Sequence, residues 1–202
     1  MNSRQLCILA LPLLSAACAS SPSNWLLSKY GQASKVSAFT VCRDYGCSKR
    51  MRVSLTGDEW SRVRALFASA PATAPEERET VRRAVAMIET LVGPKAGTAN
   101  DRPGADIVTT NREGLLDCID EAFNTSTYLR FLAADQLLRW HDTGPSAQRG
   151  YIFNGWPHNT ATLIERGSRS PYTVDSWFHA NGELPETVPL QNWLDGWNPP
   201  QA

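Results

Sequence analysis

The hydrophobic periodicity of this chain changes along its length, and this change constrains the fold more than any other feature. From about residue 56 to residue 140 the apolar residues recur with helical spacing, whereas later segments read as short strands separated by turns. Several helices followed by a run of antiparallel strands indicate an α+β domain. The 202 residues are enough for one domain with its own core. We predict a single α+β domain over 36–202, with a helical N-terminal half packed on a small antiparallel sheet.

Start and stop signals place the individual elements. Thr56 and Glu59 form a capping box, and a helix with one apolar stripe follows them. A second helix is expected to open at Pro75 and to end at Gly93–Pro94, and a third to begin near Asp117. Strands are expected in a hairpin within 36–53 and over the segments 151–153, 160–165 and 172–177.

The first residues have the features of a bacterial secretory signal. A single positive charge precedes the apolar run Leu6–Leu14, and small residues follow at 15–20. The apolar run is nine residues long, too short to span a bilayer as a helix. We therefore expect the mature protein to be exported to an oxidising compartment.

The end of this signal allows two kinds of processing. The stretch Leu14–Cys18 resembles a lipoprotein box, in which the cysteine becomes the lipidated first residue. The alternative is ordinary cleavage after Ala19, because Ala17-Cys18-Ala19 also fits an A-x-A site. With lipidation, 1–17 is the signal, 18–35 is a small, polar tether, and a lipid on Cys18 anchors the protein to a membrane. The expected location is then the bacterial cell envelope, facing the periplasm.

The remaining cysteines divide into a pair and a single thiol. Cys42 and Cys47 are separated by the turn-forming residues Asp44–Gly46, so we expect them to close a small hairpin disulfide. No second cysteine pair exists to complete a structural zinc site, and no metal is expected. Cys118 is left without a partner.

Cys118 is a candidate nucleophile because of its expected position in a helix. Asp117 is a good N-cap, which places Cys118 in the first helical turn. There the helix dipole and the free amides favour a thiolate, lower the thiol pKa and can hold an oxyanion. Asp117, Asp120 and Glu121 oppose this effect, so a thiolate would need a cationic partner. The alternative is a buried, inert cysteine.

The cationic partner must be one of three histidines. His141 is expected at a helix end and His179 in a turn, whereas His158 stands beside an aromatic residue at the entrance of a strand and is our candidate. Asp175 would orient the imidazole. Pairing 158 with 175 centres the hairpin at 166–167 and makes the two residues cross-strand neighbours. The alternatives are a surface turn histidine and an aspartate that caps a turn.

These residues carry a resemblance to a known family. Asp117-Cys118-Ile119-Asp120-Glu121-Ala122 is similar to the D-C-x-D-x-A stretch of bacterial transglutaminase-like cysteine peptidases, and His158 followed by Val174-Asp175 resembles their H…V-D pattern. The resemblance covers roughly residues 110–180. It implies a papain-like α+β fold and a triad of Cys118, His158 and Asp175 that needs no cofactor. Asn111 is the nearest amide before Cys118 that could serve as the oxyanion side chain.

The composition excludes several other classes of function. Twenty basic and twenty acidic residues give a net charge of zero, which argues against a nucleic-acid binder with a basic surface. Nucleotide-binding, zinc-protease and serine-hydrolase motifs are missing from the sequence.

We expect a thiol enzyme that acts on amide bonds of a peptide, protein or cell-wall peptide, by hydrolysis, deamidation or acyl transfer. A cell-wall peptidase of the NlpC type is a close variant, although its third residue is usually histidine. The alternative from another class is a non-catalytic envelope lipoprotein that serves as a binding or scaffold module.

Overall fold

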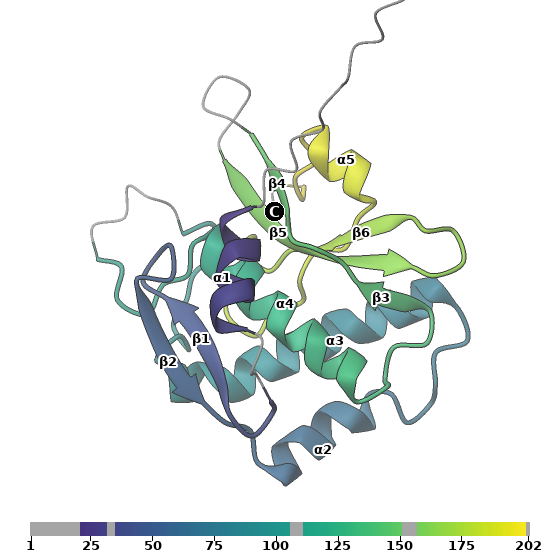
Figure 1. The fold of residues 1–202 in the computed structure, drawn as a ribbon, viewed down its shortest axis with the longest axis horizontal. Helices are drawn as coiled ribbons and strands as arrows, with labels where there is room; N and C mark the ends of the chain where they lie inside the picture. Colours follow the sequence, from purple (N-terminus) through teal and green to yellow (C-terminus); the bar gives the residue numbers. More distant parts are fainter. Residues whose placement is uncertain (1–20, 32–34, 106–110, 151–156, 201–202) are drawn as a thin grey trace, which may run out of the picture.

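A computed structural model describes residues 21–31, 35–105, 111–150 and 157–200 of the protein. Helices and small antiparallel sheets are combined in one arrangement, which confirms the expected α+β class (Figure 1). The helices are α1 (Pro22–Tyr30), α2 (Gly57–Ala65), α3 (Ala74–Ala96), α4 (Cys118–Ala134) and α5 (Leu190–Leu194). The strands are β1 (Phe39–Arg43), β2 (Lys49–Val53), β3 (His141–Thr143), β4 (Ala147–Arg149), β5 (His158–Glu165) and β6 (Pro171–Val174). Among the helices in these ranges, none has the length and apolar character needed to cross a membrane.

The strands form two antiparallel sheets. In the first, β1 pairs with β2 as the expected hairpin. In the second, β5 is the central strand: β3 and β4 pair with successive parts of it, and β6 pairs with it over Ala161–Ile164. The predicted strand at 151–153 lies outside the described residues.

Helix α4 lies in the middle of the molecule and connects both sheets with the helical layer (Figure 1). It packs on β5, on β1, on α1 and on α3. Its aromatic residue Phe131 meets Phe39 of β1 and Trp60 of α2 in edge-to-face contacts, with ring centroids 5.0 and 6.3 Å apart. Helix α4, which begins at the candidate nucleophile Cys118, is therefore held by packing on several sides.

Two capping predictions are confirmed. The Thr56 side chain accepts from the backbone N–H of Glu59, and the Glu59 carboxylate accepts from the backbone N–H of Thr56, so the capping box starts α2. Asp117 is the N-cap of α4, with its carboxylate accepting from the N–H groups of Ile119 and Asp120. Both helices start where local chemistry satisfies their first free amides.

The expected end of the second helix was wrong. Helix α3 continues through Gly93–Pro94 and ends at Gly97, whose φ of 75° is the left-handed conformation that glycine adopts at low cost. The N–H groups of Gly97 and Thr98 both reach the carbonyl of Gly93. Pro94 lies in the last turn, where its missing N–H removes a single hydrogen bond and does not stop the helix.

Two other expectations also need correction. The segment 18–35 was expected as a tether, but Pro22–Tyr30 forms α1, because Leu26 and Leu27 are buried against the disulfide and Phe123 of α4. His141 was expected at a helix end, but α4 stops at Ala134 and His141 is the first residue of β3. In both cases long-range packing decides the local structure.

The predicted disulfide is present: Cys42 and Cys47 are bonded across the end of the β1–β2 hairpin, with Cα atoms 4.5 Å apart. The bond closes a short loop, so its removal should cost little loop entropy. We expect the Cys42→Ser/Cys47→Ser variant to lose about 2 kcal/mol of unfolding free energy. Urea unfolding of both proteins tests this, and equal midpoints would contradict it.

Candidate functional site

The candidate site begins with Cys118, which is the first residue of α4 as the sequence predicts. Its side chain is half-buried. The sulfur lies 3.9 Å from the carbonyl oxygen of Pro157 and 3.7 Å from Nδ2 of Asn159. These two residues flank His158, the first residue of β5. The packing of α4 on β5 therefore brings the thiol to the segment that carries the candidate base.

His158 and Asp175 are joined directly. Nε2 of His158 and Oδ2 of Asp175 are 2.8 Å apart, and the side chains are only 5% and 1% exposed. The register differs from the predicted one: Ala161 pairs with Val174, so the hairpin centre lies one residue later than expected and His158 is not directly opposite Asp175. The contact is made on the diagonal across the two strands, a separation that long side chains can bridge.

The other ring nitrogen distinguishes His158 from the other two histidines. Nδ1 of His158 is buried and has no hydrogen-bond partner in the described part of the chain. His141 uses its Nδ1 on Glu77 and its Nε2 beside Arg78, and His179 contacts Glu186 through Nε2. A lone pair on Nδ1, with Nε2–H donating to a carboxylate, is the tautomer that can accept a proton.

Aromatic rings surround the His158–Asp175 pair. The imidazole lies 4.6 Å from the Trp177 ring and 5.3 Å from the rings of Phe178 and Trp193. Trp193, fully buried in α5, donates its indole N–H to the same Oδ2 of Asp175 at 2.8 Å. The carboxylate thus accepts from two sides and is fixed in place, which in turn fixes the imidazole.

The short helix α5 is itself tied to the sheet by Arg149 of β4. The guanidinium donates to the carbonyl of Trp197 at 2.6 Å and lies 4.5 Å from the Trp193 ring centroid. This cation–π contact and hydrogen bond hold the indole against the imidazole. The sequence does not reveal this role of Arg149, because it depends on how residues 190–198 fold back onto β4.

The resting state of the thiol differs from the expectation. Burial raises the pKa of Cys118 to about 12, and the neighbouring Asp117 carboxylate adds to the rise, while hydrogen bonds from Asn159 act against it. The helix N-terminus compensates only in part, because the N–H groups of Ile119 and Asp120 are already used by the Asp117 cap. Within the described residues no hydrogen bond joins Cys118 to His158, so the sulfur rests as a neutral thiol.

An amide side chain that was not among the candidates contacts the thiol. Asn111 is exposed in the segment before α4, and its Oδ1 accepts from the N–H of Glu113. Asn159 of β5 instead points its Nδ2 at the Cys118 sulfur. Successive side chains of a strand point to opposite faces, so the sequence pattern does not place Asn159 and His158 in one site.

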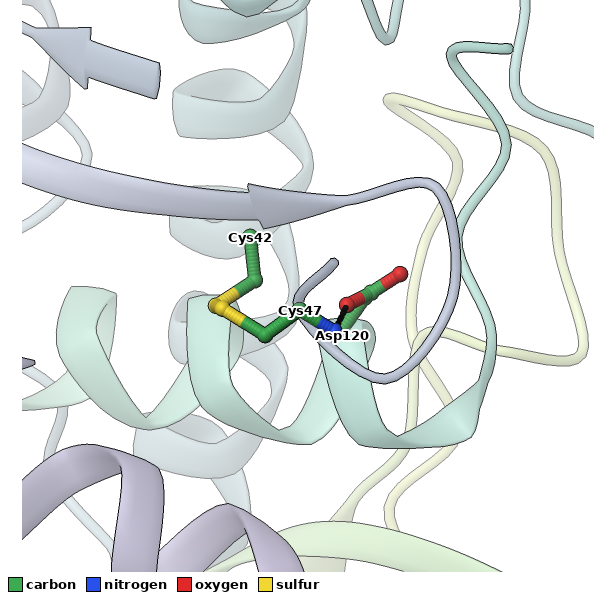
Figure 2. A group of neighbouring side chains, drawn as sticks. All are labelled: Cys42, Cys47 and Asp120. Atoms are coloured by element: carbon green, nitrogen blue, oxygen red, sulfur yellow. Dashed lines mark hydrogen bonds between the residues drawn. A yellow bond between two sulfur atoms is a disulfide. The ribbon is translucent and has the colours of Figure 1, made fainter. Parts of the chain in front are cut away.

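The disulfide loop supports the first turn of α4 from the other side (Figure 2). The N–H groups of Tyr45 and Cys47 donate to the two carboxylate oxygens of Asp120 at 2.8 and 2.6 Å, and the N–H of Gly46 donates to Asp117 at 2.9 Å. The sulfurs of Cys42 and Cys47 and an oxygen of Asp120 lie within 4.8 Å of one another, a spacing compatible with a metal. The sulfurs are bonded to each other and the oxygens accept amides, so this group is a covalent and hydrogen-bonded brace.

Several carboxyl groups are buried beneath the site. Glu89 of α3 accepts from Ser176 Oγ at 2.8 Å and from the N–H of Gly182 at 3.1 Å. Burial raises the pKa of Glu89 to about 7, and burial also raises that of Asp101 to about 7. Glu121, one turn after Cys118, is hydrogen-bonded to Asp101, and its pKa also lies well above the usual range because it is buried. These groups keep their protons in the folded state at mildly acid pH.

This cluster predicts an unusual dependence of stability on pH. Between the ordinary pKa of an unfolded carboxyl and the folded value near 7, the folded state binds more protons than the unfolded state. Stability should therefore decrease as the pH rises through this range, by about 1.4 kcal/mol per pH unit for each such group. Urea unfolding between mildly acid and mildly alkaline pH measures it. Glu89→Gln should flatten the slope and the exposed Glu113→Gln should not, and a flat wild-type profile would contradict the prediction.

The site therefore contains a thiol at a helix start, a buried imidazole–carboxylate pair with one free ring nitrogen, and an amide donor beside the sulfur. Such groups together can support nucleophilic attack on a carbonyl carbon. Comparison of the chain with protein-family models, with curated proteins and with solved structures gave no match.

Proposed function

We propose that the protein is an exported thiol enzyme that acts on amide bonds, with a transglutaminase-like version of the papain-like fold. The observation that supports this most is the His158–Asp175 pair, 2.8 Å apart and buried, with Nδ1 of His158 unpartnered next to the segment that contacts the Cys118 sulfur. A merely structural histidine, such as His141, has partners for both ring nitrogens. A buried nitrogen without a partner is costly, and a role in a reaction is one reason for a protein to keep it.

In the proposed mechanism His158 acts first as base and then as acid. Nδ1 takes the thiol proton while the Cys118 sulfur bonds to the carbonyl carbon of the substrate. The imidazolium is stabilised by Asp175 through Nε2–H, and it then returns the proton to the leaving nitrogen as the amide C–N bond breaks. Because the thiol is neutral at rest, proton transfer accompanies the attack and does not precede it.

Two donors are suited to the oxyanion that forms in this step. One is the backbone N–H of Cys118, which has no partner among the described residues and points out of the helix start. The other is Nδ2 of Asn159. We assign the oxyanion side chain to Asn159 in place of Asn111.

The acyl-enzyme thioester would be resolved by water or by an amine. Water gives hydrolysis or deamidation, and an amine gives transfer; no metal or cofactor takes part in either route. The substrate is a peptide, a protein or a cell-wall peptide. In this proposal a lipid on Cys18, which lies outside the described residues, holds the enzyme to the envelope membrane on the periplasmic side.

Alkylation of Cys118 as a function of pH tests the proposal, with the Cys42–Cys47 disulfide left oxidised. We expect His158→Ala to slow iodoacetamide labelling near neutral pH by roughly ten-fold or more, because the base that takes the thiol proton is then lost. His179→Ala is the matched control and should label like wild type. Equal rates in all three proteins would make Cys118 a structural thiol and would favour the non-catalytic binding module.

A further inference from the structure

The charge of this neutral chain is unevenly distributed. Residues 21–53 contain six basic residues and one acidic residue, whereas residues 54–202 contain thirteen basic and nineteen acidic residues. The positive segment comprises α1 and the β1–β2 hairpin, which lie side by side in Figure 1. Such an asymmetry within one domain indicates a surface that meets a negatively charged partner.

Four side chains of α1 and β2 form one continuous surface, which we call the cationic–aromatic ridge: Trp25, Lys29, Tyr30 and Arg50. Nζ of Lys29 lies 4.8 Å from the Trp25 ring centroid and 5.3 Å from that of Tyr30. The Arg50 guanidinium lies over the Tyr30 ring, 4.7 Å from its centroid. The ridge therefore joins the helix to the hairpin edge.

The ridge is exposed and its charge is not neutralised. Trp25 is 54% exposed, more than any other large apolar residue in the described ranges, and Lys29 and Arg50 are also exposed. Neither cation has a carboxylate partner within the described ranges, and Arg52, two residues further along β2, extends the charge in the same direction. Of the neighbouring cations, Lys49 is paired with Asp44. An exposed tryptophan beside unpaired cations is the composition of a membrane interface.

The start of α1 also fixes how far this surface can be from a lipid on Cys18. Three peptide units join Cys18 to the N-cap Ser21, so the span is at most about 10 Å. A lipidated Cys18 would thus place α1 at the level of the lipid headgroups. The helix cannot leave the domain to insert, because Leu26 and Leu27 are buried against Phe123.

We propose that the cationic–aromatic ridge is a membrane-docking surface that rests on an anionic bilayer. Lys29 and Arg50 meet lipid phosphates, and Trp25 enters the interface between headgroups and acyl chains. Two cations near an anionic surface give a modest attraction, so the ridge orients an anchored protein but does not by itself hold it permanently. This docking rests on the lipid at Cys18 that the proposed function includes, but it does not depend on the thiol chemistry, which the alkylation experiment tests separately.

Quenching of tryptophan fluorescence by brominated lipids tests the proposal. The processed protein would be purified from membranes and reconstituted into vesicles of phosphatidylethanolamine with phosphatidylglycerol, or of phosphatidylcholine alone. We expect quenching in the anionic vesicles that Trp25→Phe removes and that the Lys29→Glu/Arg50→Glu variant reduces several-fold. High salt should have the same effect as the charge reversal, because it screens the lipid phosphates.

Matched controls keep the result interpretable. Trp140, 40% exposed on a distant part of the chain, should be replaceable by phenylalanine without loss of quenching. Arg62→Glu/Arg83→Glu changes the net charge equally on exposed sites of α2 and α3 and should leave quenching unchanged. Quenching that is unaffected by Trp25→Phe, or equal in the two lipids, would overturn the proposal. The proposal would also be overturned if the protein associated with itself in sedimentation without lipid and the ridge variants prevented this. The ridge would then be a contact between copies of the chain.

Discussion

Replacing Cys118 by alanine should abolish turnover of an amide substrate, and replacing His158 by alanine should lower it by about a thousand-fold or more. The first change removes the atom that bonds to the carbonyl carbon. The second leaves a neutral thiol whose pKa is near 12 with no base to take its proton. Release of ammonia or amine from glutamine-containing and cell-wall peptides measures both effects, once a turned-over substrate is found among them.

Controls separate chemistry from folding in this experiment. His179→Ala removes a histidine whose Nε2 contacts Glu186 and that makes no hydrogen bond to Cys118 within the described residues, and its turnover should stay within a few-fold of wild type. Trp193→Phe keeps the ring beside the imidazole but loses the hydrogen bond to Asp175, so it should lower turnover without removing it. A His158→Ala variant that retains wild-type turnover would exclude this residue as the base.

The parts of the site that the sequence predicts are those governed by local rules. Asp117 caps a helix in almost any context, so Cys118 could be placed in the first helical turn before any fold was known. The turn residues between Cys42 and Cys47 likewise predict a short closed loop. His158 and Asp175 could be chosen as candidates because each stands at a strand boundary.

The parts that were missed depend on contacts between distant segments. The pairing of β5 with β6 is shifted by one residue at the hairpin centre, and no turn residue in 166–170 reveals this shift. Helix α1 forms because Leu26 and Leu27 pack against Phe123 of α4. Asn159 and Trp193 reach the site only through tertiary packing. The thiol pKa is not predictable from the helix position for the same reason, because the burial of Cys118 raises it more than the helix dipole lowers it.

Asp120→Ala should destabilise the protein by on the order of 4 kcal/mol, the largest loss that we expect from any single change in the disulfide brace. Its carboxylate is fully buried and accepts the N–H groups of Tyr45 and Cys47. Alanine would leave both buried donors without a partner, and each unsatisfied group costs about 1–3 kcal/mol. Asp120→Asn keeps one acceptor and replaces the other by a donor, so its loss should be roughly half as large.

The backbone of the loop explains why these two hydrogen bonds matter. Four consecutive residues are left-handed, with φ values of 66° at Asp44, 71° at Tyr45, 60° at Gly46 and 59° at Cys47. Only the glycine adopts this conformation readily, and each of the others costs about 1–2 kcal/mol. The left-handed turn aims its successive N–H groups at the carboxylates of α4, so Asp120 offsets the strain that the turn introduces.

Urea unfolding measures these differences for wild type, Asp120→Asn, Asp120→Ala and the exposed control Asp58→Ala. The control should unfold with a free energy within about 0.5 kcal/mol of wild type. Combining Asp120→Ala with Cys42→Ser/Cys47→Ser should cost less than the sum of the separate losses, because either change alone already frees the loop from its left-handed turn. If the two losses of unfolding free energy were strictly additive, the disulfide and the Asp120 carboxylate would stabilise the protein independently. Their coupling, in contrast, would make the covalent bond and the buried acid a single brace beneath the helix that presents Cys118.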